Sequence, residues 1–232
     1  MRKILPFAAI ILAACTPSAY LNIGGATWRT TEAFSATLYS VGVIETTGRN
    51  RFDPKGGKVT LNDFPIEALT TFHSEETATA SLKAEGKWTP SVATTAAELE
   101  AKKEKRLKGV YVVFRNQDTY GLINKLNEPV NQQTLTHLKE ESKPVIVTGV
   151  AVVYDNDIYK NTELRSGVNA SFNSGSGSPV IELKGSSKSE IKASFSDGTV
   201  FAYEYSRIEW DTNSSAPKVK HLTVDRPANS GF

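Results

Sequence analysis

The chain has 232 residues, of which 39% are hydrophobic and 22% are charged. This composition excludes a collagen-like chain, a coiled coil and a disordered chain, and it is typical of a globular protein with a buried core. The formal net charge is +2, and removing Arg2 and Lys3 leaves equal numbers of basic and acidic side chains. A body without net charge has no general electrostatic attraction to nucleic acid, so we expect no nucleic-acid partner.

The first fifteen residues have the layout of a secretory signal. Arg2 and Lys3 precede an apolar run from Ile4 to Ala14, and Cys15 follows. The length of this run suits a signal peptide and falls short of the ~20 residues that a membrane-spanning helix needs. Pro6 interrupts the run, which argues against a buried helix of the folded domain.

The end of this segment, Leu12-Ala13-Ala14-Cys15, resembles the lipobox of bacterial lipoproteins, in which small residues precede an invariant cysteine. The resemblance implies a diacylglyceryl thioether on the Cys15 sulfur, cleavage before Cys15 and acylation of the new amino group. Residues 1–14 would then be a cleaved signal peptide, and Cys15 the site of lipid attachment. Cys15 is the only cysteine, so a thioether there would leave no free thiol and no possible disulfide.

The residue after the cysteine bears on the choice of membrane. In enterobacterial lipoproteins an aspartate there tends to retain the protein at the inner membrane, and this chain has Thr16. We therefore expect an outer-membrane location, with the inner membrane as the less favoured alternative. Residues 15–26 are expected to form the lipidated N-terminus and a short tether, or to include the first strand. A tether of about ten residues reaches at most about 35 Å.

Strand patterns dominate the first part of the body. We predict a strand over Phe34–Glu45, which is rich in β-branched and aromatic residues, and turn chemistry over Arg49–Gly57. A short strand is expected over Lys58–Leu61, one or two helical turns over Pro65–Phe72, and a weakly alternating strand over Ala78–Trp88.

The clearest helix is predicted over Thr95–Lys108. Thr95 and Glu98 fit a capping box, basic side chains lie in the last turn, and Gly109 supplies a stop. This polar helix could link two lobes, with a boundary near residues 90–108, although one domain over residues 27–232 is the preferred interpretation.

The second half predicts more strands. Val110–Phe114 and Tyr120–Leu126 are followed by a second helix over Asn131–Glu141 and by the apolar segment Pro144–Tyr154, a central buried strand. Four further strands are expected, with a hairpin at Asp197-Gly198, at Pro179–Lys184, Glu190–Ser196, Thr199–Trp210 and Lys218–Val224. The predicted fold class is therefore β-rich α+β, mainly an antiparallel meander in the C-terminal half with two peripheral helices.

No pattern of catalytic or metal-ligating residues emerges. His73, His137 and His221 are widely spaced and belong to no ligand motif. Asp155 and Asp157 could supply oxygens to Ca²⁺, but the spacing fails the EF-hand pattern, so a turn after the buried strand is the favoured interpretation. We predict no catalytic residue, no cofactor and no metal site.

Two segments could contact a partner. The basic run Lys102–Lys108 is interleaved with glutamates, which favours a solvated face with ion pairs over a contact with anionic lipid. Ser166–Ser178 is rich in Gly and Ser, which favours a mobile hairpin loop over a partner-binding loop.

These observations leave three hypotheses for function. The preferred one is a membrane-anchored envelope lipoprotein with a non-enzymatic binding or assembly role, whose partners are the membrane, through Cys15, and another envelope protein. The alternatives are a periplasmic enzyme acting on envelope glycans and a carrier of a lipid or small molecule.

Overall fold

The structure is a computed structural model that describes residues 20–23, 26–45, 51–70, 75–84, 101, 110–154, 168–174, 180–184, 190–194 and 198–225. Its strands are β1 (Tyr20–Ile23), β2 (Ala26–Arg29), β3 (Ser40–Glu45), β4 (Arg51–Lys58), β5 (Phe64–Thr70), β6 (Val110–Asn116), β7 (Pro144–Tyr154), β8 (Val168–Asn173), β9 (Val180–Lys184), β10 (Glu190–Ser194), β11 (Thr199–Trp210) and β12 (Val219–Val224). The α-helices are α1 (Glu75–Ala84), α3 (Thr119–Leu126) and α4 (Gln132–Glu140), and the 3-10 helices are η1 (Ala33–Ser35) and η2 (Pro129–Asn131).

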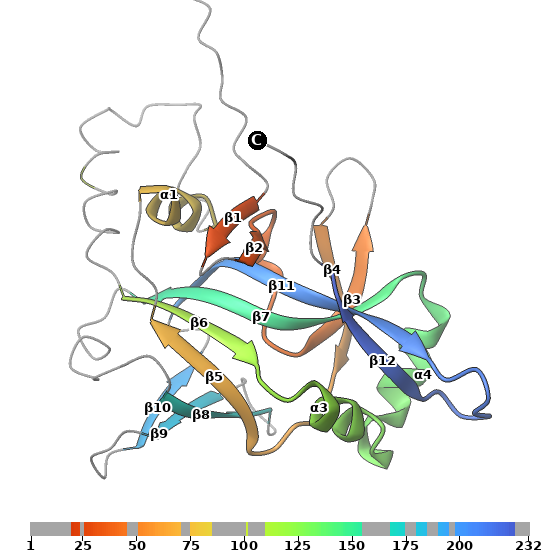
Figure 1. The fold of residues 1–232 in the computed structure, drawn as a ribbon. Helices are drawn as coiled ribbons and strands as arrows, with labels where there is room; N and C mark the ends of the chain where they lie inside the picture. Colours follow the sequence, from red (N-terminus) through yellow and green to blue (C-terminus); the bar gives the residue numbers. More distant parts are fainter. Residues whose placement is uncertain are drawn as a thin grey trace, which may run out of the picture.

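The strands form one antiparallel sheet in the order β1-β2-β11-β7-β6-β5-β8-β9-β10 (Figure 1). In addition, β12 pairs with β11, and β3 pairs with both β4 and β7. Strands β8, β9 and β10 follow one another in the sheet as they do in the sequence. The fold is therefore the expected β-rich α+β fold.

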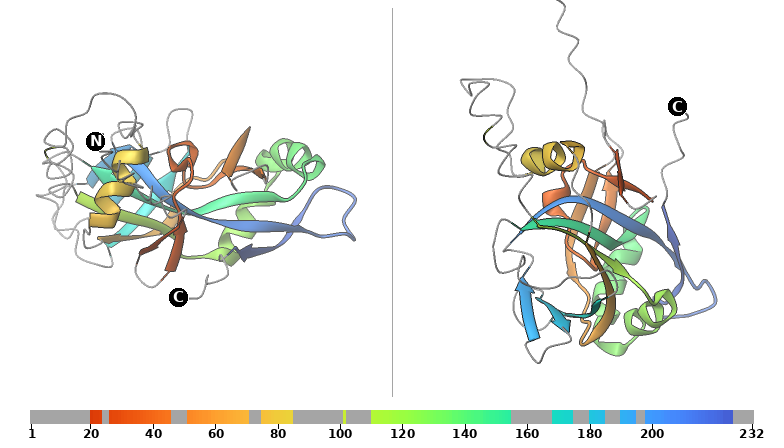
Figure 2. Two further views of the ribbon diagram at one scale, coloured as in Figure 1. Left: turned by 90° about the horizontal axis from the view of Figure 1, so that it is seen from above. Right: turned by 60° about the vertical axis from the view of Figure 1, so that its left-hand side comes forward.

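The two longest strands, β7 and β11, extend beyond their neighbours, so each pairs with two different strands along one edge. One edge of β7 pairs with β6 over residues 149–154 and with β3 over residues 144–146. Likewise, β11 pairs with β2 at Tyr203 and with β12 from Ser206 onward. The β11–β12 hairpin extends to the end of the molecule opposite α1 (Figure 2).

Both faces of this sheet are covered, which explains why all eleven residues of β7 are buried. On one face the β1–β2 hairpin and α1 cover a smaller apolar cluster, formed by Leu21, Ile23, Trp28, Tyr111, Val113, Ala151, Val153, Phe201 and Ala202. The larger core includes side chains of η1, β3, β4, α3 and α4. In Figure 1, α1 and the β1–β2 hairpin lie above the sheet, and α3 and α4 lie toward the lower right.

The long C-terminal strands were predicted closely. The predictions for Pro144–Tyr154 and Thr199–Trp210 coincide with β7 and β11, and the second helix, predicted over Asn131–Glu141, corresponds to α4. The predictions over Val110–Phe114, Pro179–Lys184, Glu190–Ser196 and Lys218–Val224 match β6, β9, β10 and β12 to within a few residues.

The predictions for β3 to β5 need correction. Only Ser40–Glu45 of the first predicted strand is extended, because η1 precedes it. Residues 51–57 form most of β4 rather than a turn, and Pro54 is tolerated because β4 pairs with β3 alone among the described strands. Of the strand predicted over Lys58–Leu61, only Lys58 is in a strand. Strand β5 replaces the predicted helical turns, and its alternating buried residues Phe64, Ile66 and Ala68 explain why.

Two segments predicted as strands are helices. In α1, Ala78 and Leu82 are buried four residues apart, which is the helical period rather than the strand period. In α3, Leu122 and Leu126 repeat that spacing, and the Asp118 carboxylate caps the helix by accepting from the Gly121 N–H at 2.7 Å. The strand predictions over 78–84 and over 120–126 are therefore wrong.

The Asp197-Gly198 hairpin prediction is also wrong. Among the described strands, β10 pairs only with β9, and β11 pairs with β7, β2 and β12. A Cβ at position 198 would lie 2.5 Å from the Val152 side chain and 2.6 Å from the Tyr154 ring. Glycine is needed at this position because the backbone passes close to β7, not because a tight turn joins two paired strands.

The segment Ser166–Ser178 is not simply a loop, because it contains β8. Ala170 and Phe172 of β8 are buried, and the strand pairs with both β5 and β9. Pairing on both edges outweighs the small, polar composition of the segment. The predicted signal peptide (residues 1–14), the helix predicted over Thr95–Lys108 except Ala101, and Asp197 lie outside the described residues.

Candidate functional site

The residues singled out from the sequence do not meet at one place. Cys15, Asp155, Asp157, the basic run Lys102–Lys108 and His73 lie outside the described residues. The other two histidines are exposed on separate elements, α4 and β12. Within the described ranges no group of three His, Cys, Asp or Glu side chains could hold a metal ion.

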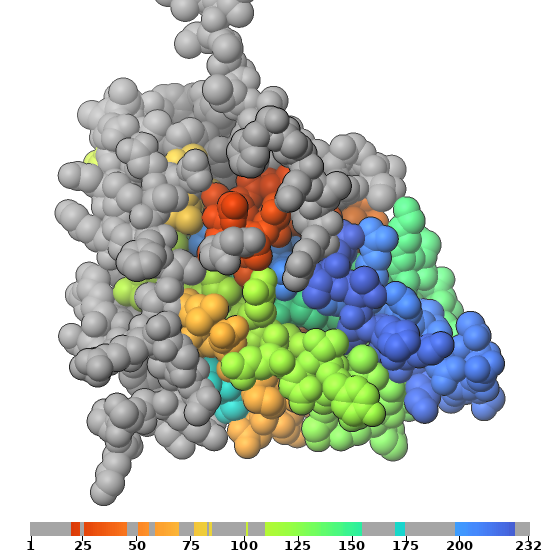
Figure 3. Space-filling model, in the orientation of Figure 1, coloured from red at the N-terminus to blue at the C-terminus, as the bar shows by residue number. Residues whose placement is uncertain are grey.

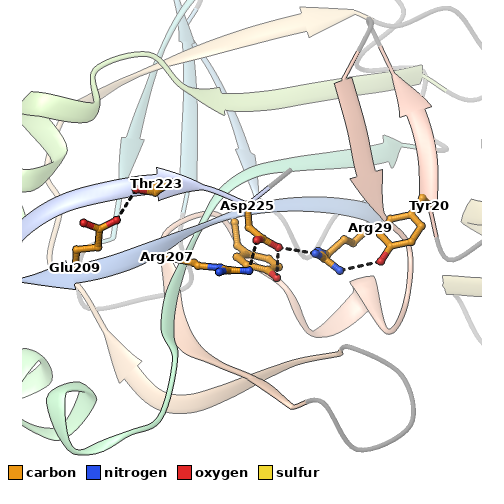
Figure 4. Close-up of polar contacts among 7 residues, drawn as sticks. Tyr20, Arg29, Arg207, Glu209, Thr223 and Asp225 are labelled. Carbon is orange, nitrogen blue, oxygen red and sulfur yellow. Dashed lines mark hydrogen bonds and ion pairs between the residues drawn. The ribbon is translucent and has the colours of Figure 1, made fainter. Parts of the chain in front are cut away.

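The most buried charged cluster joins the two ends of the described chain (Figure 4). It consists of Tyr20 of β1, Arg29 at the end of β2, Tyr205 and Arg207 of β11, and Asp225, which directly follows β12. We call these five residues the terminal clasp. No local sequence pattern indicates this cluster, because Arg29 and Asp225 are 196 positions apart.

Both oxygens of the Asp225 carboxylate form hydrogen bonds or ion pairs. Oδ2 of Asp225 accepts from Nη2 of Arg29 at 2.6 Å and from the hydroxyl of Tyr205 at 2.5 Å. Oδ1 pairs with Nη2 of Arg207 at 2.5 Å. The second guanidinium nitrogen of Arg29 donates to the hydroxyl of Tyr20 at 3.2 Å. Charge-assisted hydrogen bonds of this kind are the strong class.

Backbone pairing places these side chains. In the β1–β2 hairpin Tyr20 lies opposite Arg29, and Arg29 lies opposite Tyr203 of β11. The Asp225 N–H donates to the Tyr205 carbonyl at 3.0 Å, which extends the β11–β12 pairing to the clasp. The Arg29 guanidinium lies 4.8 Å from the centroid of the Tyr205 ring and 5.4 Å from that of Tyr20, so both rings flank it.

The clasp favours the charged forms of Arg29 and Asp225 and the neutral form of Tyr205. Burial by itself lowers the pKa of Arg29, but the oxygens of Tyr205, Asp225 and Tyr20 more than offset this and raise it. Burial likewise acts to raise the pKa of Asp225, but the hydrogen bond from Tyr205 and the charges of Arg29 and Arg207 lower it overall. Burial and the Asp225 carboxylate raise the pKa of the Tyr205 phenol. At neutral pH the clasp therefore holds two guanidiniums and one carboxylate.

This geometry suits a fixed contact rather than acid–base chemistry. A general acid or base needs a pKa near the working pH and access to a substrate, whereas the Asp225 pKa is lowered and both of its oxygens are occupied. The side chains of Arg29 and Asp225 are only 7% and 12% exposed, while Arg207 is 64% exposed. The clasp therefore fixes the two ends of the described chain to β11 and leaves the Arg207 guanidinium at the surface.

A second arginine–carboxylate pair joins β6 to β11. Nη2 of Arg115 on β6 pairs with Oε2 of Glu204 on β11 at 2.9 Å, and the guanidinium lies 5.3 Å from the ring of Trp28. Gly149 of β7 allows the indole to approach, since a Cβ there would lie 2.8 Å from Trp28 Cη2. This pair crosses the middle of the sheet, and no sequence motif marked it.

Comparison with known protein families, with curated protein sequences and with solved structures found no match to this chain. Two features of the chain's own residues remain to indicate a function. They are the resemblance to a lipobox ending at Cys15 and the terminal clasp, which begins five residues later at Tyr20.

Proposed function

We propose that this protein is a bacterial lipoprotein anchored in the outer membrane through Cys15, with a β-rich body that has a non-enzymatic binding or assembly role. The observation that carries the anchoring is the order of elements in the leader. Two cationic residues, an apolar run and the tripeptide Leu12-Ala13-Ala14 precede the only cysteine of the chain. Two or three acyl chains would hold the body at a bilayer, since each buried CH₂ contributes about 0.8 kcal/mol.

The position of the folded body supports the same proposal. The sheet begins at Tyr20, so a short segment separates the lipidated residue from the first strand. No described helix is long and apolar enough to cross a bilayer.

The state of the buried carboxylates favours a binding or assembly role over the enzymatic alternative. Glycoside hydrolysis uses two carboxyl groups that face one substrate. Here Glu204 and Asp225 are each neutralised by arginine, the first by Arg115 and the second by Arg29 and Arg207. Groups paired in this way stabilise a structure and are poorly placed to exchange protons with a substrate.

The test of anchoring is the variant Cys15→Ser, expressed in a bacterium that processes lipoproteins. Wild type should incorporate labelled palmitate and partition into the detergent-rich phase, because the thioether requires the sulfur. Cys15→Ser should do neither, and it should keep its leader or be released as a soluble protein. Ser18→Ala is the matched control, since it changes a nearby hydroxyl and leaves the lipobox intact.

Two results would contradict the proposal. One is a wild-type protein without label, and the other is a Cys15→Ser protein that remains acylated. Co-purification from solubilised membranes then addresses the binding role, because an envelope partner should be recovered with wild type and also with a Cys15→Ser body added back to the membranes.

A further inference from the structure

The distance between the proposed anchor and the folded body is short. Residues 16–19 alone separate Cys15 from Tyr20. At about 3.3–3.6 Å per residue, the five steps from Cys15 to Tyr20 span at most about 18 Å. The point at which the chain joins the sheet therefore decides which end of the body lies at the bilayer.

That point is firmly held. Tyr20 pairs with Arg29 across the β1–β2 hairpin and accepts a hydrogen bond from the Arg29 guanidinium at 3.2 Å. The same guanidinium binds Asp225, so the first and last described residues are fastened together. In the space-filling view, atoms of the N-terminal strands (red) and of the C-terminal strand (blue) reach the surface on the same face (Figure 3).

The clasp also gives this end a positive charge. Its two guanidiniums exceed its single carboxylate by one charge, and Arg207 is the member that reaches solvent, with 64% of its side chain exposed. A basic side chain close to a membrane is attracted to anionic headgroups over about a Debye length. The exposed guanidinium is thus complementary to a phospholipid surface.

We infer that the terminal clasp faces the bilayer, with Arg207 directed at anionic headgroups and the β11–β12 turn directed away from them. The inference rests on the proposed anchoring through Cys15. Val224, 37% exposed, lies beside the clasp, and Asn213 is exposed in the turn at the other end of the hairpin. Six residues of strand and turn lie between Asn213 and Ser206, the partner of Val224, which corresponds to roughly 20 Å.

The experiment uses the acylated protein in vesicles of phosphatidylethanolamine and phosphatidylglycerol. Cys15 would be blocked by its thioether, so a cysteine introduced by Val224→Cys or by Asn213→Cys would be the only free thiol for a fluorophore. A nitroxide-labelled headgroup lipid quenches fluorophores near the bilayer surface. The label at position 224 should be quenched several-fold more strongly than the label at position 213.

Charge is tested by a matched pair of variants. Arg207→Gln should reduce the quenching at position 224, and the reduction should disappear in phosphatidylcholine vesicles, which carry no net charge. Lys220→Gln removes the same charge from an exposed site on β12 further from the clasp and should leave the quenching unchanged.

The outcomes separate this inference from the anchoring. Equal quenching at the two positions, or stronger quenching at position 213, in a protein shown by mass spectrometry to be acylated would overturn the orientation and leave the anchor standing. A wild-type Cys15 that reacts with the thiol-directed fluorophore would overturn both. Equal effects of Arg207→Gln and Lys220→Gln on the quenching at position 224 would show that Arg207 does not contact the membrane.

Discussion

The two arginine–carboxylate pairs of this protein use the same chemistry in different surroundings. In the clasp, Arg29 is almost fully buried, and Asp225 receives hydrogen bonds or ion pairs from three side chains. In the second pair only the carboxylate is buried, because the Glu204 side chain is 7% exposed while Arg115 keeps 31% exposure. The clasp therefore isolates both Arg29 and Asp225 from water, whereas the second pair isolates its carboxylate alone.

The two pairs also differ in how much backbone pairing surrounds them. The second pair joins β6 to β11 across β7, where backbone ladders already hold all three strands. The clasp joins residues 196 positions apart, with a single residue pair between β2 and β11 beside it. Loss of the clasp should therefore release the chain ends, whereas loss of the second pair should leave the topology intact.

The largest expected effect is that of Asp225→Asn. This change leaves the buried Arg29 guanidinium without a counter-charge, and removing one partner of a buried pair costs about 3 kcal/mol or more of unfolding free energy. We expect a loss of about 3 kcal/mol in urea unfolding of the mature chain carrying Cys15→Ser. Glu209→Gln is the control, since this exposed carboxylate accepts from the Thr223 hydroxyl at 2.7 Å, and its loss should cost no more than about 0.5 kcal/mol. Similar costs for the two variants would contradict a structural role for the clasp.

A smaller effect is expected for Glu204→Gln. The amide keeps the shape and one acceptor, and the Arg115 guanidinium retains access to water, so the charge left behind is partly solvated. We expect a cost of about 1.5 kcal/mol, the range of a hydrogen bond to a charged group. The measurement is the same urea unfolding. A cost above that of Asp225→Asn would reverse the comparison between the two pairs.

The smallest effect is confined to acid. The pKa of Asp225 is lower in the folded protein than its ordinary value of 3.8, so its charge stabilises the fold above about pH 4. This contribution is lost as the pH falls through the folded pKa. The stability gap between wild type and Asp225→Asn should be constant from neutral pH to about pH 4 and should shrink below it. A gap that already shrinks near pH 6 would mean that another group titrates.

The sequence allowed the interior of the fold to be predicted better than its edges. The predicted ends of strands β7 and β11 coincide with the observed ones. Strand β7 is a continuous apolar run because both of its faces are covered, and β11 is rich in aromatic and β-branched residues. Helix α1 was missed because its buried residues Ala78 and Leu82 are too few to outweigh an apparent alternation. Strand β4 was missed because Pro54 and its neighbouring glycines normally favour turns, and only pairing with β3 makes them extended.

The proposed anchor and the clasp differ in the same way. The resemblance to a lipobox is local, so lipid attachment at Cys15 could be proposed from its immediate neighbours. The clasp depends on the order of strands, which brings β2 and the end of β12 to the same edge of β11. One signal was available, since Tyr205 and Arg207 alternate in one predicted strand, but nothing local identified Asp225 as their partner.

The most direct test of the account is mass spectrometry of the amino-terminal peptide from membrane-purified wild-type protein. We expect a peptide that begins at Cys15, carries a diacylglyceryl group on its sulfur and contains no part of residues 1–14. A peptide that retains the leader, or one that begins elsewhere and has a free thiol at Cys15, would contradict the proposed anchor and with it the orientation of the clasp.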